Sequence, residues 1–577
     1  MVDVTREIER KYEATDGGGL PDLAGVAGVA GTTDQGVVTL DATYYDTPGR
    51  RLAADGITLR RRTGGDEGWH LKLPVGPDAR DEIRAPLSDA LPAGLAGLVR
   101  SRTRGAELSP LVHLLSERTV RRLVDADGAL LAVLSADRVT ARRLAPEPGE
   151  PVRWTEVEVE LAPGGDPALL DALEPRLTDA GLRRSATPSK LARALAETDP
   201  DRRGEGATGS EQATGVGKPT EPEKPAKAGK AEKAGKAATP GKPAKTGKAA
   251  KAAKNGKPGK SAKAGRDKQG KRDKRDKRVK PKKATAGDIV LDYARRQAAE
   301  IVALDPAVRL ETPDSVHRMR VATRRLRSAF RSYREVLDRA VTDPVGDELK
   351  WLAAELGVDR DHEVLTARLG ERLGEVPVEL RLGPVAARLR IWSQARRGGS
   401  RERVLGVLDG ERYLALLNAL DALVAGPPLR PAAARPWAEV IPRAVLRDYD
   451  RLSGRVEAAL AAPAGPGRDA LLHEARKDAK RARYAAEVAR PAVGEPAKAF
   501  AGLMARVQDL LGDHQDSVVA RKALRELAVQ AHGAGESAFT FGLILGREEA
   551  RAAARERELP GLWAEVSREE HRAALGA

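Results

Sequence analysis

The stretch HRMRVATRRLR, residues 317–327, places one histidine and five arginines in eleven positions. A second stretch, HEARKDAKRAR at 473–483, repeats the same order of basic residues. Two further sequence marks, LGVDRD at 356–361 and LGDHQD at 511–516, are about 155 residues apart, as the two basic stretches are. Two marks repeated in the same order indicate a duplicated unit. The matching basic residues are His317/His473, Arg320/Arg476, Arg324/Lys480, Arg325/Arg481 and Arg327/Arg483.

Both stretches are predicted to be helices with one cationic and one apolar side. At helical spacing five basic residues that begin at His317 fall within roughly an 80° arc, and Met319, Leu326 and Phe330 lie opposite. Helical spacing continues almost throughout residues 285–577. We therefore predict an all-helical domain there, built from two pseudo-two-fold related helical bundles that face one another. The cationic stripe of the first helix is His317, Arg320, Arg324, Arg327 and Arg331.

A stripe of one charge sign is unusual for a face that only meets water. A solvated helix face normally mixes signs, because like charges four residues apart repel. Arginine forks match phosphate oxygens, and two facing stripes would attract a phosphate-rich polyanion. Nucleic acid is the rival ligand, but base-stacking sites use aromatic residues, which are 3% of this chain. A polymer made of phosphate alone fits the stripes better.

Residues 1–198 carry the alternation of charged and apolar residues that is typical of strands. In EIERK, for example, Glu7, Glu9 and Lys11 point the same way on a strand, and Ile8 points to the other side. The alternation predicts an antiparallel sheet or barrel in an α+β, multidomain chain. Similar alternation places Arg60 with Arg62, His70 with Lys72, and Glu156 with Glu158 and Glu160.

These charged faces have two interpretations. On any single strand, a solvated outer face is the simpler one. If the faces instead converge inside a closed barrel, clustered carboxylates require a cation, and their hard oxygens suit Mg²⁺ or Mn²⁺. The basic residues would then hold phosphate oxygens. The expected metal ligands are Glu7, Glu9, Glu158 and Glu160, and the expected phosphate ligands are Lys11, Arg60, Arg62, Lys72 and Arg118.

The chain between the two domains, residues 199–284, repeats Lys, Ala, Gly and Pro and has too few apolar residues to form a core. Between 218 and 283 it holds 25 Lys and Arg against 6 Asp and Glu, a charge of +19. The whole chain carries +16, so the remainder carries 16 − 19, or −3. We predict a disordered linker. It would serve either as a spacer or as an arm for non-specific contact with nucleic acid or another polyanion.

Cysteine is absent, which excludes disulfides and a thiol nucleophile. The charged N-terminal sequence lacks the apolar core of a signal peptide, and no apolar run is long enough to span a membrane. We therefore expect a cytoplasmic protein with no membrane partner, and an association with polyphosphate granules would follow from the expected ligand.

The two copies of H-x2-R-x3-R/K-R-x-R with their LG-x3-D marks resemble the CHAD family of conserved histidine α-helical domains. The E-x-E-x-K sequence at 7–11, followed by R-x-R, L-K, E-x-E and the "SK" at 189–190, resembles the CYTH, or triphosphate tunnel metalloenzyme, family. The first resemblance implies binding of inorganic polyphosphate. The second implies a tunnel that binds triphosphate and metal ions, and the pairing is similar to bacterial inorganic triphosphatases.

The CYTH resemblance extends the expected site. It adds Asp137 to the metal ligands, Glu82 as a less certain one, and Lys190 to the triphosphate ligands. One departure is Arg84, which stands where the family often has a second acid after Glu82. The resemblance implies catalysis by Glu7, Glu9 and Lys11 together with Mg²⁺ or Mn²⁺.

Three functions remain open from the sequence. The first is metal-dependent hydrolysis of inorganic tripolyphosphate, with long-chain polyphosphate bound by the helical domain. The second is a polyphosphate-binding protein without turnover. The third is a CYTH enzyme acting on ATP or thiamine triphosphate, for which Trp69 and Tyr45 are the stacking candidates, although either could equally be core.

Overall fold

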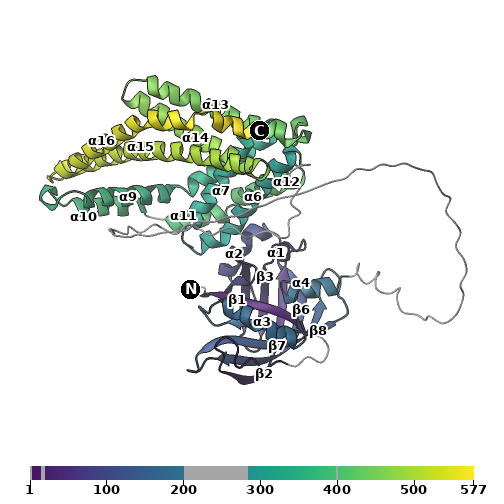
Figure 1. The fold of residues 1–577 in the computed structure, drawn as a ribbon. Coiled ribbons are helices and arrows are strands. Elements are labelled where there is room, and N and C mark those ends of the chain that lie inside the picture. Colours follow the sequence, from purple (N-terminus) through teal and green to yellow (C-terminus); the bar gives the residue numbers. More distant parts are fainter. Residues whose placement is uncertain (1–2, 15–19, 200–283, 398–399, 577) are drawn as a thin grey trace, which may run out of the picture. The chain divides into compact units, whose positions relative to one another are not determined.

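A computed structural model describes residues 3–14, 20–199, 284–397 and 400–576 (Figure 1). The predicted disordered linker, residues 199–284, lies almost entirely outside the described residues. The described strands and helices of the N-terminal domain run from Asp3 to Glu197, and those of the helical domain run from Ala286 to Gly576. The predicted α+β, multidomain fold class is confirmed.

Within the described part of the N-terminal domain, eight antiparallel strands close into a barrel. Around the barrel the strands follow the order β1-β5-β4-β3-β2-β6-β7-β8, and β1 pairs with both ends of this series. It does so by contacting β5 through residues 3–8 and β8 through residues 9–13. The strands are β1 Asp3–Ala14, β2 Gly31–Asp46, β3 Thr58–Thr63, β4 Gly68–Pro74, β5 Ala79–Ala85, β6 Ser109–Val124, β7 Leu130–Arg143 and β8 Val152–Leu161; the short β9, Leu182–Arg184, adds to β1.

Apolar residues on the outer face of the barrel are covered by two helices. Leu59, Leu71 and Ile83 alternate with charged neighbours and pack in one cluster with α2, Ala93–Thr103. On the other side, Val157 and Val159 pack in a cluster with α3, Ala168–Asp179. Because side chains alternate along a strand, burying these apolar residues outside directs the charged residues between them into the barrel.

One section of the barrel interior is apolar. Val112, Val139 and Trp154 belong to a buried cluster with Leu191 and Ala194 of α4, Lys190–Glu197. Trp154 and Glu156 are two residues apart on β8 and so share one face. The charged section of the interior therefore borders a section filled by side chains.

The sequence pattern predicts β1, β3, β4 and β8, and alternation in ERTVRRLV (117–124) and LLAVLSADRVTARRL (130–144) predicts much of β6 and all of β7. It misses β2 and β5. Most of the first half of β2 is exposed, so its residues do not alternate between apolar and polar. In β5 the sequence ARDEIRA contains one large apolar residue, Ile83. Pairing with neighbouring strands, which sequence periodicity does not report, makes these segments strands.

The C-terminal domain is helical throughout its described residues. Its longest helices, α13 to α16, lie side by side (Figure 1). The helices are α6 Ala286–Arg309, α7 Ser315–Ser332, α8 Arg339–Glu355, α9 Val358–Gly374, α10 Val385–Arg397, α11 Ser400–Asp409, α12 Glu411–Ala425, α13 Trp437–Ala461, α14 Pro466–Val493, α15 Glu495–Gly533, α16 Phe539–Val566 and α17 Glu569–Gly576, with short 3₁₀ turns at Val378–Leu380 and Pro431–Ala434.

Both basic stretches lie on helices, α7 and α14, with the expected apolar side buried. Met319, Leu326 and Phe330 of α7 are in the main core of the domain, to which α14 also contributes. Helix α15 is long enough to contribute residues to two hydrophobic clusters. Phe500 belongs to the main core, whereas Leu527 packs with α9, α10 and α16 in a second, smaller cluster. The helices of both repeats thus share one core.

Candidate active site and candidate polyanion site

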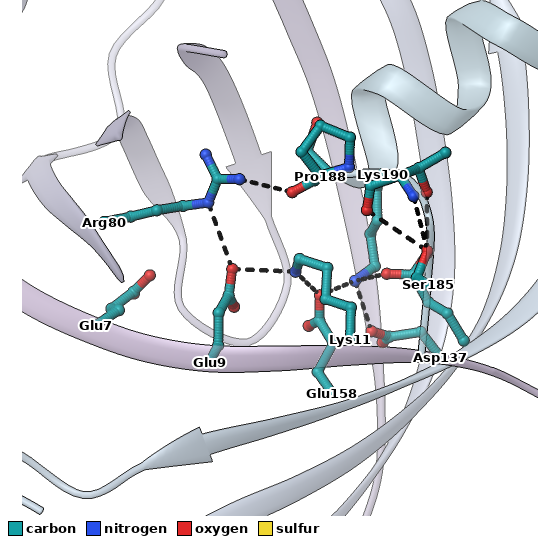
Figure 2. A network of polar contacts seen from close by, with 12 residues as sticks. Glu7, Glu9, Lys11, Arg80, Asp137, Glu158, Ser185, Pro188 and Lys190 are labelled. Carbon is teal, nitrogen blue, oxygen red and sulfur yellow. Dashed lines mark hydrogen bonds and ion pairs between the residues drawn. The ribbon is translucent and has the colours of Figure 1, made fainter. Parts of the chain in front are cut away.

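The register of the barrel brings the charged residues of β1 opposite those of β8 and β5. Glu9 lies opposite Glu160, and Lys11 lies opposite Glu158. On the other edge of β1, Glu7 lies opposite Arg80. The side chains of Glu9, Lys11 and Glu158 form one network that continues to Lys190 and Asp137 (Figure 2).

Lys190 is the cation at the centre of this network. Its ammonium group lies 2.7 Å from Glu156, 2.7 Å from Glu158 and 2.9 Å from Asp137. It is the first residue of α4, whose N-cap Ser189 accepts a hydrogen bond from the backbone N–H of Ala192 at 3.1 Å. Burial opposes its charge, but the three carboxylates raise the pKa of Lys190.

The carboxylates around Lys190 are also held by other donors. Both oxygens of Asp137, which is fully buried, accept hydrogen bonds of 2.7 Å from Arg118. Glu156 accepts from the Trp154 indole at 2.7 Å. Despite its burial, Glu158 has a pKa well below its usual range, because Lys11, Lys190 and Arg118 surround it. This part of the interior is therefore close to charge balance.

Several carboxylates lie close together around Glu7, with Lys72 and, at 3.9 Å, Arg84 as the cations beside Glu7. Burial and the neighbouring carboxylates Glu82 and Glu160 raise the pKa of Glu7 to about 7, although Lys72 lies 2.5 Å away. Burial also raises the pKa of Glu160, and the charges of Glu9 and Glu158 add to the effect. Repulsion between buried carboxylates is relieved by a cation.

These acids fit the requirements of a divalent cation. Glu7, Glu9 and Glu160 offer the hard oxygen ligands that Mg²⁺ and Mn²⁺ prefer, and two of the three have raised pKa values. Glu9 differs: burial opposes its charge, but Lys11 and Lys72 lower its pKa to about 2. Asp137 and Glu158 already have cationic partners, so an ion there would compete with Arg118 and Lys190.

The arginines of β3 form the basic wall of the interior. Arg60 donates a hydrogen bond of 3.2 Å to the Tyr44 hydroxyl, and Arg62 contacts Asp66. The Nε atoms of Arg60 and Arg62 are buried and have no hydrogen-bond partner among the described residues. Burial and the nearby charge of Arg60 lower the pKa of Arg62. An anion with several oxygens would satisfy these donors.

In the helical domain, the cationic sides of α7 and α14 face one another. Burial and the charges of Arg324, Arg476 and Arg483 lower the pKa of Lys480 to about 8. Burial also lowers the pKa of Arg324, with Arg320 and Arg476 contributing. Charges on two helices affect one another in this way only when they are close.

Several of these cations have no anionic partner. Among the described residues, Arg324, Arg476 and Lys480 make no ion pair with a carboxylate within 4 Å, and the Nε atoms of Arg324, Arg327 and Arg476 are buried without a hydrogen bond. His473 Nδ1 is likewise buried and unpaired. Asp361 and Asp516 lie near enough to act on these cations but make no ion pair with them. A surface that keeps so many like charges together has the chemistry of an anion site.

Other basic residues of the two stretches, also expected to bind polyphosphate, have carboxylate partners within the domain. Arg320 contacts both oxygens of Asp361 at 3.1 and 3.2 Å. Arg481 lies 3.0 Å from Asp448, which is almost fully buried in α13. This pair ties α14 to α13. Glu487 accepts hydrogen bonds from Arg325 at 2.9 Å and from Arg483 at 3.2 Å.

In the helical domain, two carboxylates lie next to a histidine. The Nε2 atom of His514 lies 3.3 Å from both Asp469 and Glu556. The outer oxygens of these carboxylates contact Arg521 at 2.9 Å and Arg468 at 3.0 Å. Because the two arginines balance the two carboxylates, we assign no metal to this group.

Comparison with known proteins identifies two domain families in the chain. The model of the CYTH domain matches residues 5–195, and that of the CHAD domain matches residues 292–525. Two Mycobacterium tuberculosis proteins, Rv2226 of strain ATCC 25618 / H37Rv and MT2285 of strain CDC 1551 / Oshkosh, are each 35% identical over 571 residues, which is 96% of this chain and 94% of theirs. This chain belongs to the CYTH–CHAD family.

Two solved structures resemble part of the chain. PptA from Streptomyces chartreusis is 21% identical, with a TM-score of 0.42, over 49% of this chain and all of PptA. The CHAD domain from the plant Ricinus communis is 25% identical, with a TM-score of 0.39, over 49% of this chain and 92% of that domain. In the described part of the CYTH–CHAD chain, no helix has the length and apolarity needed to cross a membrane.

The CYTH barrel brings together all the residues expected at its site, and two more. Arg80 lies 3.6 Å from Glu9 and donates a hydrogen bond of 2.6 Å to the carbonyl of Pro188 (Figure 2). Its alternation with Glu82 along β5 is the signal that would have found it. Glu156 was expected on the charged face but was given no role, and it contacts Lys190.

The remaining expected residues have clear positions. Glu82 contacts His70 at 3.1 Å, and Arg84, the departure from the family pattern, donates to the same carboxylate. Trp69 and Tyr45 belong to the outer cluster with α2, where their ring centroids are 5.0 Å apart. They do not line the interior, so they are unsuited to stacking on a ligand there.

Replacing Lys190 with alanine is expected to destabilise the CYTH domain by about 3 kcal/mol, because it leaves three buried carboxylates with too little positive charge. Urea unfolding of the full chain would measure this loss. Millimolar Mg²⁺ should restore part of it, because oxygens of Asp137, Glu156 and Glu158 lie within 4.8 Å of one another. Lys190→Arg is the charge-preserving control, and equal effects of Mg²⁺ on the alanine variant and the wild type would contradict the expectation.

The low pKa of Lys480 predicts that the CHAD domain becomes more stable as the pH rises from about 8 to 10.5. In this window the unfolded lysine keeps a proton that the folded one has lost, so the unfolded state binds more protons. The gain is on the order of 1–3 kcal/mol. Urea unfolding at both ends of the window would detect it, and it should be absent in Lys480→Met. The same rise in the variant would disprove the assignment to Lys480.

Proposed function

We propose that the CYTH domain hydrolyses inorganic tripolyphosphate with Mg²⁺ or Mn²⁺, and that the CHAD domain binds longer polyphosphate. The CYTH family comprises metal-dependent triphosphatases and cyclases. The observation that carries the proposal is the division of one closed interior into an acidic wall on β1 and β8 and a basic wall on β3. A triphosphate with its metal ion needs both.

The residues of the two walls have different tasks in this proposal. Glu7, Glu9 and Glu160 would hold the divalent ion, which supplies charge neutralisation and activates water. Arg60 and Arg62 have unpaired buried donors and would bind phosphate oxygens. The remaining phosphate ligands would be Lys11, Lys72, Arg118 and Lys190.

Binding and positioning supply most of the catalysis of phosphoryl transfer. In the proposed reaction, a water molecule attacks a terminal phosphorus atom in line with the bridging oxygen. The new P–O bond forms as the bridging P–O bond breaks, giving phosphate and pyrophosphate, and the two protons of the water end on these two products. Lys190 and Arg118 are held in place by Asp137 and Glu158, so they are preorganised to meet the negative charge on the phosphate oxygens.

We propose an inorganic substrate, rather than ATP or thiamine triphosphate, because of the side chains that line the barrel interior. Tyr44 is committed to Arg60, and the nearby apolar section is filled by Trp154 and α4. Trp69 and Tyr45 pack outside the barrel. An organic group would have to stack on some other surface.

Polyphosphate binding by the CHAD domain is supported by the uncompensated cations of α7 and α14. Arg324, Arg476 and Lys480 repel one another in the free domain, and a chain of phosphates would remove this repulsion. Both domains would then recognise one polymer class. The predicted contact of the basic linker with nucleic acid falls on residues outside the described structure. Deleting residues 205–283 would test it, since only that activity should be lost.

Replacing Glu9 with glutamine is expected to lower the rate of tripolyphosphate hydrolysis by about 100-fold or more, because one metal ligand loses its charge. Phosphate release by the full chain would be measured with tripolyphosphate, ATP and thiamine triphosphate, each with Mg²⁺, Mn²⁺ or EDTA. Glu117→Gln makes the same chemical change on an exposed side chain of β6 and should have no effect.

Two outcomes would reject the enzymatic proposal. Unchanged turnover in Glu9→Gln would remove the proposed metal site. No turnover by the wild-type chain on any of the three substrates, while triphosphate still binds, would leave the second function, a polyphosphate-binding protein built on an enzyme fold.

The double variant Arg324→Ala/Lys480→Ala is expected to weaken the binding of long-chain polyphosphate by about 100-fold, because two charge-assisted contacts are lost. Titration at fixed salt concentration would measure this change, and a salt series should show a smaller slope. Arg318→Ala/Lys477→Ala removes two exposed cations of the same helices, paired with Glu300 and Glu474, and is the matched control. Similar losses in both variants would mean that only net charge matters.

A further inference from the structure

The glycines of the two LG marks lie against the arginines of the two basic marks. A Cβ atom at Gly357 would lie 2.6 Å from the Nη2 atom of Arg320 and 2.9 Å from its Cζ atom. A Cβ atom at Gly512 would also lie nearest to an arginine, with the Nε atom of Arg476 at 3.4 Å. The two repeated sequence marks are therefore in contact with one another in each half of the domain.

The backbone at these positions does not require glycine. Gly357 has φ −95°, and Gly512 lies inside α15 without a positive φ. Glycine within a helix costs about 1 kcal/mol relative to alanine. The requirement at Gly357 is therefore for space, and the side chain that occupies this space is the Arg320 guanidinium, with the backbone carbonyl oxygen of Ala353 beside it.

The guanidinium of Arg320 is held from two directions. Gly357 lies against it, and Asp361, one turn further along α9, contacts its two terminal nitrogens at 3.1 and 3.2 Å. Arg320 is 8% exposed, so its position is tightly restricted. Its positive charge still contributes to lowering the pKa of Arg324 and the pKa of Lys480.

The second half of the domain is less restricted. The distance of 3.4 Å at Gly512 is an ordinary contact, so alanine fits there without displacing Arg476. Arg476 makes no ion pair within 4 Å with a described carboxylate, in contrast to Arg320. The repeats are thus alike in sequence but differ in how firmly each arginine is held.

We propose that Gly357 is a positioning residue of the polyphosphate site: it leaves the space in which Arg320 lies, and so aligns this arginine with Arg324 and Lys480 across the two basic helices. The inference depends on the proposed binding of polyphosphate by the CHAD domain. A methyl group at Gly357 would push the guanidinium out of this alignment, whereas the same methyl group at Gly512 would not.

The test is a double-mutant cycle in the full chain, with long-chain polyphosphate as the ligand. Gly357→Ala should weaken binding about tenfold, as expected when one charge-assisted contact is misplaced. In an Arg320→Ala background, the same glycine substitution should have no further effect, because it acts only through this arginine. Gly512→Ala, whose added methyl group makes only ordinary contacts with Arg476 from 3.4 Å, and Gly370→Ala, whose added methyl group has no atom within 4 Å, should bind like the wild type.

The outcomes separate this inference from the proposed function. If the wild-type chain does not bind polyphosphate, the proposed function fails and the inference fails with it. If the wild type binds but Gly357→Ala binds equally well, only the inference is wrong. An added Cβ at Gly357 would also lie 2.9 Å from the carbonyl oxygen of Ala353. A loss of binding that persists in the Arg320→Ala background would therefore assign the effect to this backbone contact and overturn the role of Gly357.

Discussion

The contact between Lys190 and three buried carboxylates is the interaction on which the barrel depends. Asp137 of β7 lies directly opposite Glu156 of β8, and Glu158 is two residues further along β8 on the same face. Without a cation, their repulsion in a region of low dielectric would oppose the pairing of β7 with β8. The cation comes from the start of α4, a helix that also fills one section of the interior with apolar side chains. Fold and site therefore share the same residues.

The two domains treat charge in opposite ways. In the CYTH barrel most charges have partners of opposite sign, and the carboxylates with raised pKa values are Glu7 and Glu160. In the CHAD domain the imbalance is positive and lies between α7 and α14, where Lys480 is surrounded by arginines. An excess of buried carboxylate favours a metal ion, and an excess of buried cation favours phosphate. The position of each imbalance indicates the ligand more directly than the number of charged residues does.

Duplication in the CHAD domain has preserved contacts as well as residue types. Each HxxR mark touches the LG mark of its own half, although about 35 residues separate the two marks in the sequence. The halves have nevertheless diverged. Arg320 is fixed by Asp361, while Arg476 makes no ion pair within 4 Å with a described carboxylate. A repeat whose halves differ in this way can hold one part of a polymer firmly and leave another part free to adjust.

The sequence by itself determined the all-helical nature of the C-terminal part, the duplicated marks, and the faces of β1, β3 and β8 that carry charge. These follow from local periodicity, which depends only on the spacing of side chains along one element. Tertiary structure decided which charges lie together. Strand register placed Arg80 beside Glu9, although sequence periodicity did not predict β5 as a strand. Helix packing decided which basic residues of the two stretches have an anionic partner. Arg481 is paired with the buried Asp448, whereas Lys480 has no carboxylate within 4 Å among the described residues. Sequence spacing cannot make that distinction, because it depends on residues that come from distant parts of the chain.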